Sequence, residues 1–173
     1  GKAASTLGKA RRTWREAKIA EDLGGMIEGA KAHSVSFDRR IDLKRLSNLM
    51  EGKNLEEVRR LLKDRPEMYQ NLTDLTDIAR VLQTKRPGFL PISLQTPIVR
   101  QRFNDFFNYG HLMKLMGSKE RTQELMRLVS PTANMTPEAI VAGLGSLTVR
   151  LDREESTSPP EAGKVSKGVT PWR

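Results

Sequence analysis

The residues that could do chemistry are few and scattered. The chain has no cysteine, which excludes disulfides, thiolate metal sites, iron–sulfur ligation and cysteine nucleophiles. Its only histidines are His33 and His111, and neither lies in a cluster of histidines and acids of the kind that forms a metal site or a catalytic triad. A nucleotide-binding loop is missing too, because no Gly-Lys-Ser/Thr follows the glycines of residues 24–29. The sequence therefore predicts a protein that is not an enzyme and that uses neither a metal nor a cofactor.

The charge pattern indicates a polyanionic partner. The 173 residues include 30 Lys and Arg against 21 Asp and Glu, which gives a formal net charge of +9. Such an excess favours binding to nucleic acid or to an anionic surface and says little about the fold. Residues 1–53 hold twelve basic and seven acidic residues, whereas residues 54–107 and residues 108–173 each hold nine and seven. The N-terminal third is therefore the expected interface.

Eight basic residues of this third are the candidate nucleic-acid contacts. Most of them come in adjacent pairs, and neighbours on a helix point about 100° apart, so each pair spreads its charge over a flank. That distribution suits contacts to a phosphate backbone better than the reading of bases. A charge-mixed, solvated surface is the alternative interpretation. The candidates are Arg11, Arg12, Arg15, Lys18, Arg39, Arg40, Lys44 and Arg45.

The N-terminal segment is expected to form a basic helix over residues 5–31. Its apolar residues are placed on roughly one stripe. Trp14 has two interpretations, since it could stack on bases or anchor the helix beside phosphates, or it could pack in the core. The sequence contains no run of eighteen apolar residues, so it does not predict a membrane-spanning helix. The residues of the expected stripe are Leu7, Ala10, Trp14, Ile19, Leu23, Met26, Ile27 and Ala30.

The densest apolar stretch is residues 96–117, which we expect to form the central helix. Thr96 is a good N-cap, Pro97 suits the first helical position, and Gly117 is a natural stop. Large apolar side chains recur at spacings of three and four and so share one face. The residues expected to form a core or assembly surface are Phe103, Phe106 and Phe107, together with Trp172 near the C-terminus.

Shorter helices are predicted on both sides of this stretch, separated by short linkers. Their expected starts are capping residues, followed by apolar residues with helical periodicity. The predicted fold class is all-α, as an irregular array or bundle of about six to seven helices with an extended C-terminal tail. The expected starts are Asp42, Asn54, Thr73 or Asp74, Ser118 and Thr136.

Three segments follow from this pattern. Residues 1–34 form the basic amphipathic N-terminal helix, residues 35–151 the helical core domain, and residues 152–173 an extended tail rich in Pro and Ser. Such a tail cannot build a core of its own, so we expect a partner or a sister copy to hold it, with Trp172 as its anchor. The low apolar fraction of 37% also favours a homo-oligomer that completes its core with neighbours.

The pattern as a whole resembles the helical segments of large internal virion proteins of tailed bacteriophages, which are ejected with or ahead of the genome. The resemblance is carried by the stretches KDRPEMYQNL, VLQTKRPGFLP, PIVRQRFNDFFNYGHLMKLMG and SPTANMTPEAIVAGL and by the Trp-containing tail. It implies a non-enzymatic, multicopy structural component of the virion that contacts DNA, the portal–tail channel and other virion proteins. Some of these proteins include a lytic transglycosylase, but no catalytic Glu can be identified in this chain.

Two other classes of function stay open on the residues alone. One is a cellular, cytoplasmic protein that binds nucleic acid without sequence preference through its basic N-terminal third. The other is a peripheral protein that lays its N-terminal helix on an anionic membrane. Salt-dependent DNA binding would favour the nucleic-acid-binding protein or the virion protein over the membrane-binding protein.

Overall fold

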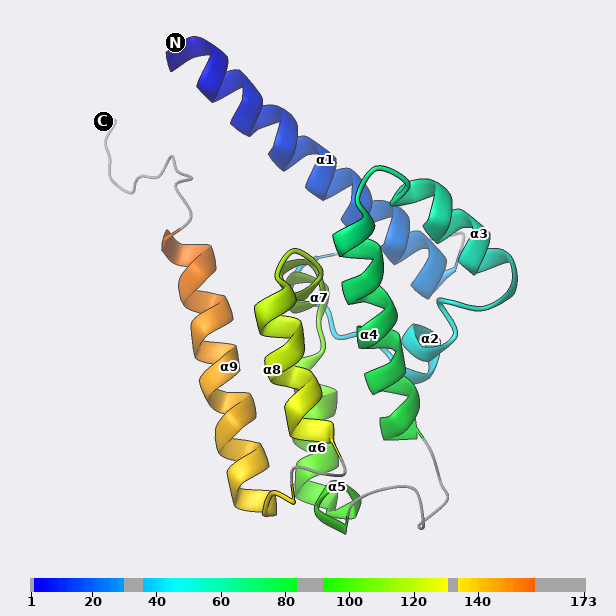
Figure 1. Cartoon of the computed structure of the whole chain (residues 1–173), viewed down its shortest axis with the longest axis vertical. Coiled ribbons are helices and arrows are strands. Elements are labelled where there is room, and N and C mark those ends of the chain that lie inside the picture. Colours follow the sequence, from blue (N-terminus) through cyan, green and yellow to red (C-terminus); the bar gives the residue numbers. More distant parts are fainter. Residues whose placement is uncertain (1, 30–35, 84–91, 131–133, 158–173) are drawn as a thin grey trace.

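The structure is a computed structural model that describes residues 2–29, 36–83, 92–130 and 134–157. Every regular element within these ranges is a helix (Figure 1), which confirms the all-α class. These ranges contain nine helices, more than the six to seven expected. Their bounds are α1 Lys2–Glu28, α2 Leu43–Ser47, α3 Gly52–Leu61, α4 Pro66–Gln83, α5 Ile92–Gln95, α6 Pro97–Phe106, α7 Tyr109–Met116, α8 Lys119–Val129 and α9 Pro137–Thr157.

Three of the expected helix starts are confirmed by their caps. The side chain of Asp42 accepts a hydrogen bond from the backbone N–H of Lys44 at 2.9 Å. The hydroxyls of Ser118 and Thr136 likewise accept from backbone N–H groups three residues further on, at 3.2 and 3.1 Å. Each cap pairs a donor that the first turn of a helix leaves without an intrahelical partner.

The other two expected starts are wrong. Asn54 lies inside α3, which already begins at Gly52, and residues 73 and 74 lie in the middle of α4. The true start of α4 is Pro66, where a missing N–H costs nothing, followed by Glu67, whose charge suits the positive end of the helix dipole. Pro66 therefore opens α4, while α3 has already ended at Leu61.

The predicted single helix over residues 96–117 is also wrong, because it breaks into α6 and α7. Phe107 is extended, and the side chain of Asn108 caps α7 by accepting from the N–H of His111 at 2.7 Å. The opened backbone pairs with a second segment: Ile41 N–H donates to Phe107 O at 3.0 Å, and Tyr109 N–H donates to the carbonyl of Arg39 at 3.2 Å. Asparagine offers the backbone such an alternative to the helix, and the hydrophobic periodicity carried no sign of it.

Gly110 lets the two segments cross closely. Its N–H donates to Phe37 O at 2.8 Å, and a Cβ added at Gly110 would lie 3.1 Å from that same oxygen. Any side chain at Gly110 would therefore push the segment before α2 away from α7.

The core is built around α7, which contacts α1, α4, α8 and α9. Phe103, Phe107 and Tyr109 have no exposed surface, and Phe106 is 4% exposed. The rings of Phe106 and Phe107 meet edge to face with their centroids 5.4 Å apart. The three phenylalanines named from the sequence are thus core residues.

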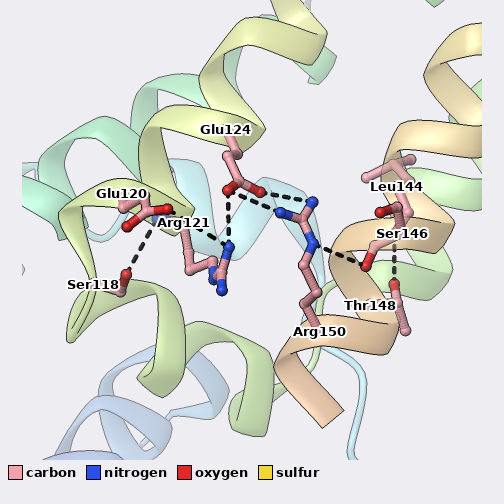
Figure 2. A network of polar contacts seen from close by, with 8 residues as sticks. All are labelled: Ser118, Glu120, Arg121, Glu124, Leu144, Ser146, Thr148 and Arg150. Atoms are coloured by element: carbon pink, nitrogen blue, oxygen red, sulfur yellow. Dashed lines mark hydrogen bonds and ion pairs between the residues drawn. The ribbon is translucent and has the colours of Figure 1, made fainter. Parts of the chain in front are cut away.

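A half-buried carboxylate links α8 to α9. Figure 2 shows Glu124 of α8 between Arg121, from its own helix, and Arg150 from α9. Nη1 of Arg121 donates to Glu124 at 2.8 Å, and Nη1 of Arg150 donates to the same oxygen at 3.0 Å. With two guanidinium partners, this carboxylate serves as a structural link between the helices.

Helix α9 continues to Thr157 and so passes the predicted tail boundary at residue 151. Its buried stripe of Leu144, Leu147 and Leu151 extends the packed face up to that point, and Asp152 contacts α7 just beyond it. The rest of the predicted tail, including Trp172, lies outside the described residues. None of the described helices is both long and apolar enough to cross a membrane.

Candidate nucleic-acid interface

Helix α1 has two halves with different surroundings. In residues 19–28, Ile19, Leu23 and Ile27 are at most 5% exposed and pack on the bundle. In residues 2–18, Leu7 is 52% exposed and Trp14 is 69% exposed. Figure 1 shows this first half, in dark blue, extending beyond the neighbouring helices. The expectation of Trp14 in the core is therefore wrong.

The single apolar stripe expected along this helix is wrong as well. Trp14 and Leu23 are nine residues apart, and at about 100° per residue they lie on opposite sides of the helix. Leu7 and Trp14, seven residues apart, lie on the same side as each other. The projecting half thus carries its own narrow apolar stripe, which turns away from the face that packs on the bundle. The stripe is Ala3, Leu7, Ala10, Trp14 and Ala17.

A row of basic residues runs beside this stripe. Arg11, Arg15 and Lys18 are spaced by four and three, so they share one face, and all three are exposed. Among the described residues, neither arginine makes an ion pair. Lys18 contacts Asp22 at 3.1 Å, and this hydrogen bond, with the charges of Asp22 and Glu21, raises the pKa of Lys18. Arg12 lies on the same half of α1, although its side chain is outside the described part of the structure.

The second group of predicted contacts is exposed, and three of its members bind other groups of the protein. Arg39 donates to Glu28 at 2.8 Å, and Arg40 donates to Asp105 at 2.7 Å. Arg45 donates to the backbone carbonyl of Glu28 at 3.4 Å. Lys44, on α2, is exposed and has no ion pair within the described ranges. The eight predicted contacts therefore lie in two groups, because Glu28, which binds Arg39 and Arg45, is about 25 Å along α1 from Arg11.

A polar cluster fixes the C-terminal end of α1 to the bundle. One oxygen of Glu28 accepts from Arg39, and the other accepts from the hydroxyl of Tyr109 at 2.8 Å. Burial and the hydrogen bond to Glu28 raise the pKa of Tyr109 far above its ordinary value. Glu28 and Tyr109 are 81 residues apart in the chain, so no local pattern could have revealed this pairing. It sets the direction in which the basic half projects.

The histidines offer no reactive site within the described part of the chain. Nδ1 of His111 lies 2.6 Å from Phe106 O, and Nε2 lies 3.1 Å from a carboxylate oxygen of Asp152. Both ring nitrogens are thus engaged, and the ring packs against Phe106, so His111 is a buried structural residue. His33 is outside the described residues. No cluster of His, Asp and Glu that could hold a metal ion is found in residues 2–29, 36–83, 92–130 or 134–157.

Comparison with known proteins gives no relative to reason from. No family model, curated protein or solved structure matches this chain. The function is therefore argued from the geometry of α1 and from the charge it carries.

Proposed function

We propose that the protein is a non-enzymatic, multicopy helical component that binds the backbone of nucleic acid through the projecting half of α1. One observation carries the proposal: residues 2–18 stand away from the bundle with six basic residues and one acid, and Arg11 and Arg15 are exposed. The row of Arg11, Arg15 and Lys18 presents charge along one face, a distribution that suits contacts to a phosphate backbone.

The position of these charges supports a role outside the folding of the helix itself. Arg11 and Arg15 are four residues apart on α1, and like charges at this spacing destabilise a helix by a few tenths of a kcal/mol. Residues 2–18 also gain little from packing, since Leu7 and Trp14 are exposed. A bound polyanion would offset both disadvantages, because each phosphate neutralises a cation of the row.

The resemblance to internal virion proteins of tailed bacteriophages suggests where such a component would act. In a virion, the proposed partners are the packaged DNA, the portal–tail channel and further copies of the chain. A cellular protein that binds nucleic acid without sequence preference would use the same basic row, and the copy number of the chain in purified particles separates the two settings.

An anionic membrane is the second candidate partner. Exposed Leu7 and Trp14 beside a basic row are the elements of a helix that lies in a lipid headgroup region. The stripe between them is alanine, however, so only two large side chains could enter the lipid. Flotation with anionic vesicles at physiological salt tests this candidate directly.

The nucleic-acid proposal is tested by the salt dependence of binding. Fluorescence anisotropy should show affinities that are similar for unrelated sequences and that fall steeply with salt. Changing Arg11, Arg15 and Lys18 together to Gln should reduce the slope of log affinity against log salt by about 2 to 3, at roughly 0.9 for each phosphate of duplex DNA that the variant no longer neutralises.

The matched control removes the same charge elsewhere. Lys53, Arg59 and Lys63 are exposed in and just after α3, and changing all three to Gln gives the same net charge as the test variant. This control should keep nearly the parent slope. If the test variant also keeps the parent slope, or if both variants lower it by the same amount, the row on α1 is not where the nucleic acid binds.

A further inference from the structure

An open groove lies between the packed half of α1 and α3, which run close together in Figure 1. Its volume is about 730 Å³. Gly25 and Gly29 form part of its wall, and a Cβ added at either would meet no atom within 4 Å. The remaining wall combines apolar and mainly acidic side chains: Met26, Leu61, Asn54, Glu21, Asp22, Glu57 and Arg60.

The projecting half of α1 has the complementary character. Leu7 and Trp14 provide an exposed apolar stripe at helical spacing, and the half that bears them carries six basic residues against one acid. An amphipathic helix with a narrow apolar stripe commonly binds in a groove that offers apolar contacts. Asp22 of the groove already binds Lys18 of its own chain at 3.1 Å, so the carboxylates of Glu21 and Glu57 supply the opposite charge.

The groove cannot receive this helix from its own chain. Helix α1 is continuous from Lys2 to Glu28, and Trp14 lies about 18 Å along its axis from Met26. The first half could reach the groove only if the helix broke and folded back on itself. The occupant must therefore come from another molecule.

We propose that the Leu7–Trp14 stripe of one copy docks in the α1–α3 groove of a second copy, head to tail. The proposal rests on the multicopy part of the proposed function and names the contact between copies. The row of Arg11, Arg15 and Lys18 lies about 90° around the helix from the centre of the stripe, so it flanks the contact and meets the carboxylates of the groove at its edge. Because the two contacting surfaces differ, repetition gives a ring or an open filament that aligns many basic rows.

The test uses one variant for each side of the contact. Leu7→Gln with Trp14→Gln removes the stripe and leaves every charge in place. Gly25→Arg fills the groove with a long cationic side chain at a position with room for it, and Glu57→Arg is the second groove variant if Gly25→Arg does not fold. Controls are Ile98→Gln with Val149→Gln, two exposed apolar residues elsewhere, and Gly145→Arg, an open glycine of α9.

Sedimentation of the full chain after nuclease treatment gives the result. The parent and both controls should assemble, and the stripe variant and the groove variant should each be monomeric. An equimolar mixture of these two should form a heterodimer of twice the monomer mass and stop there, because only one intact stripe and one intact groove are left to meet. High salt should weaken this heterodimer.

Three outcomes would overturn the contact: a monomeric parent, a mixture that stays monomeric, or variants that assemble as the parent does. Anisotropy on the same samples keeps the two proposals apart. A parent that is monomeric but binds DNA with a steep salt slope contradicts the head-to-tail contact and leaves the basic row standing. A parent that assembles but does not bind DNA contradicts the basic row alone.

Discussion

The two halves of α1 share one continuous helix and differ in almost everything else. Residues 19–28 bury Ile19, Leu23 and Ile27, contain acids and no base, and end in the buried contact between Glu28 and Tyr109. Residues 2–18 expose their large apolar side chains and carry most of the basic excess. Residues 19–28 thus pack on the bundle, whereas residues 2–18 project from it with their large apolar side chains exposed.

The difference teaches that a helix can belong to the core over part of its length and to a binding surface over the rest. Helices of 12 to 15 residues are marginal in water when no tertiary contact supports them. The packed half therefore serves as the stem that extends the basic half, and the contacts of Glu28 hold this stem in one direction. Each prediction below compares a change in the packed body with a matched change in the projecting half or elsewhere on the surface.

The largest contrast should come from aromatic residues. Phe103→Ala removes a fully buried ring from the centre of the bundle and should lower the free energy of unfolding by about 3 to 5 kcal/mol. Trp14→Ala removes a larger ring that is 69% exposed, and it should change the same quantity by less than about 0.5 kcal/mol. Urea melts measure both. Similar losses would mean that Trp14 packs on the body.

The contact at the C-terminal end of the packed half should show the next largest effect. Tyr109→Phe deletes the hydroxyl that donates to Glu28 and leaves a buried carboxylate oxygen without that donor. Hydrogen bonds to charged groups contribute about 1.5 to 3 kcal/mol, so unfolding should become easier by an amount in this range. Tyr69→Phe is the control, because the half-buried Tyr69 hydroxyl makes no hydrogen bond to the described residues. Equal effects of the two changes would argue against the Glu28 contact.

The same tyrosine should make stability depend on alkaline pH. Its pKa is raised in the folded state, chiefly by burial and then by Glu28, while in the unfolded chain it stays near 10. Its contribution is therefore fully present below pH 10 and is lost as the pH rises, because only the unfolded state then releases the proton. The loss per pH unit rises above pH 10 and approaches about 1.4 kcal/mol once the unfolded tyrosine is fully ionised.

The Tyr109→Phe variant isolates this contribution from the titration of lysines. Between pH 10 and pH 11 the parent should lose about 1 kcal/mol more stability than the variant. Urea melts at the two pH values provide the comparison. Parallel curves for parent and variant would show that Tyr109 titrates normally in the folded state.

Much of the fold could be predicted from local chemistry. Helix content followed from periodicity, and Asp42, Ser118 and Thr136 identified three starts, because capping depends only on groups a few residues apart. The buried phenylalanines followed from apolar density. Two helix boundaries did not follow from the hydrophobic pattern. Asn108 begins a new helix inside the expected central helix, and Pro66 begins α4 ahead of the expected start at residue 73 or 74.

The candidate site was only partly predictable. The basic character of residues 2–18 is visible in the sequence, but whether Trp14 is covered depends on where the bundle ends. The loss of Arg39 and Arg40 as free cations depends on Glu28 and Asp105, and Asp105 lies far along the chain. A sharper signal was the separation of nine residues from Trp14 to Leu23, which places these side chains on opposite faces of one helix.

The smallest expected effect compares the two halves by one identical change. Gly8 and Gly25 both lie in α1, and a Cβ at either meets no atom within 4 Å, so Gly→Ala adds helix propensity without a clash. Gly25→Ala should stabilise the protein by about 0.5 to 1 kcal/mol, because the packed half unfolds together with the bundle. Gly8→Ala should leave the urea midpoint unchanged, since urea melts a weakly held helix end before the bundle unfolds, while amide exchange in residues 2–18 slows. Equal shifts of the midpoint would show that both halves fold as one unit, and the picture of a packed stem with a separately frayed, basic end would then be wrong.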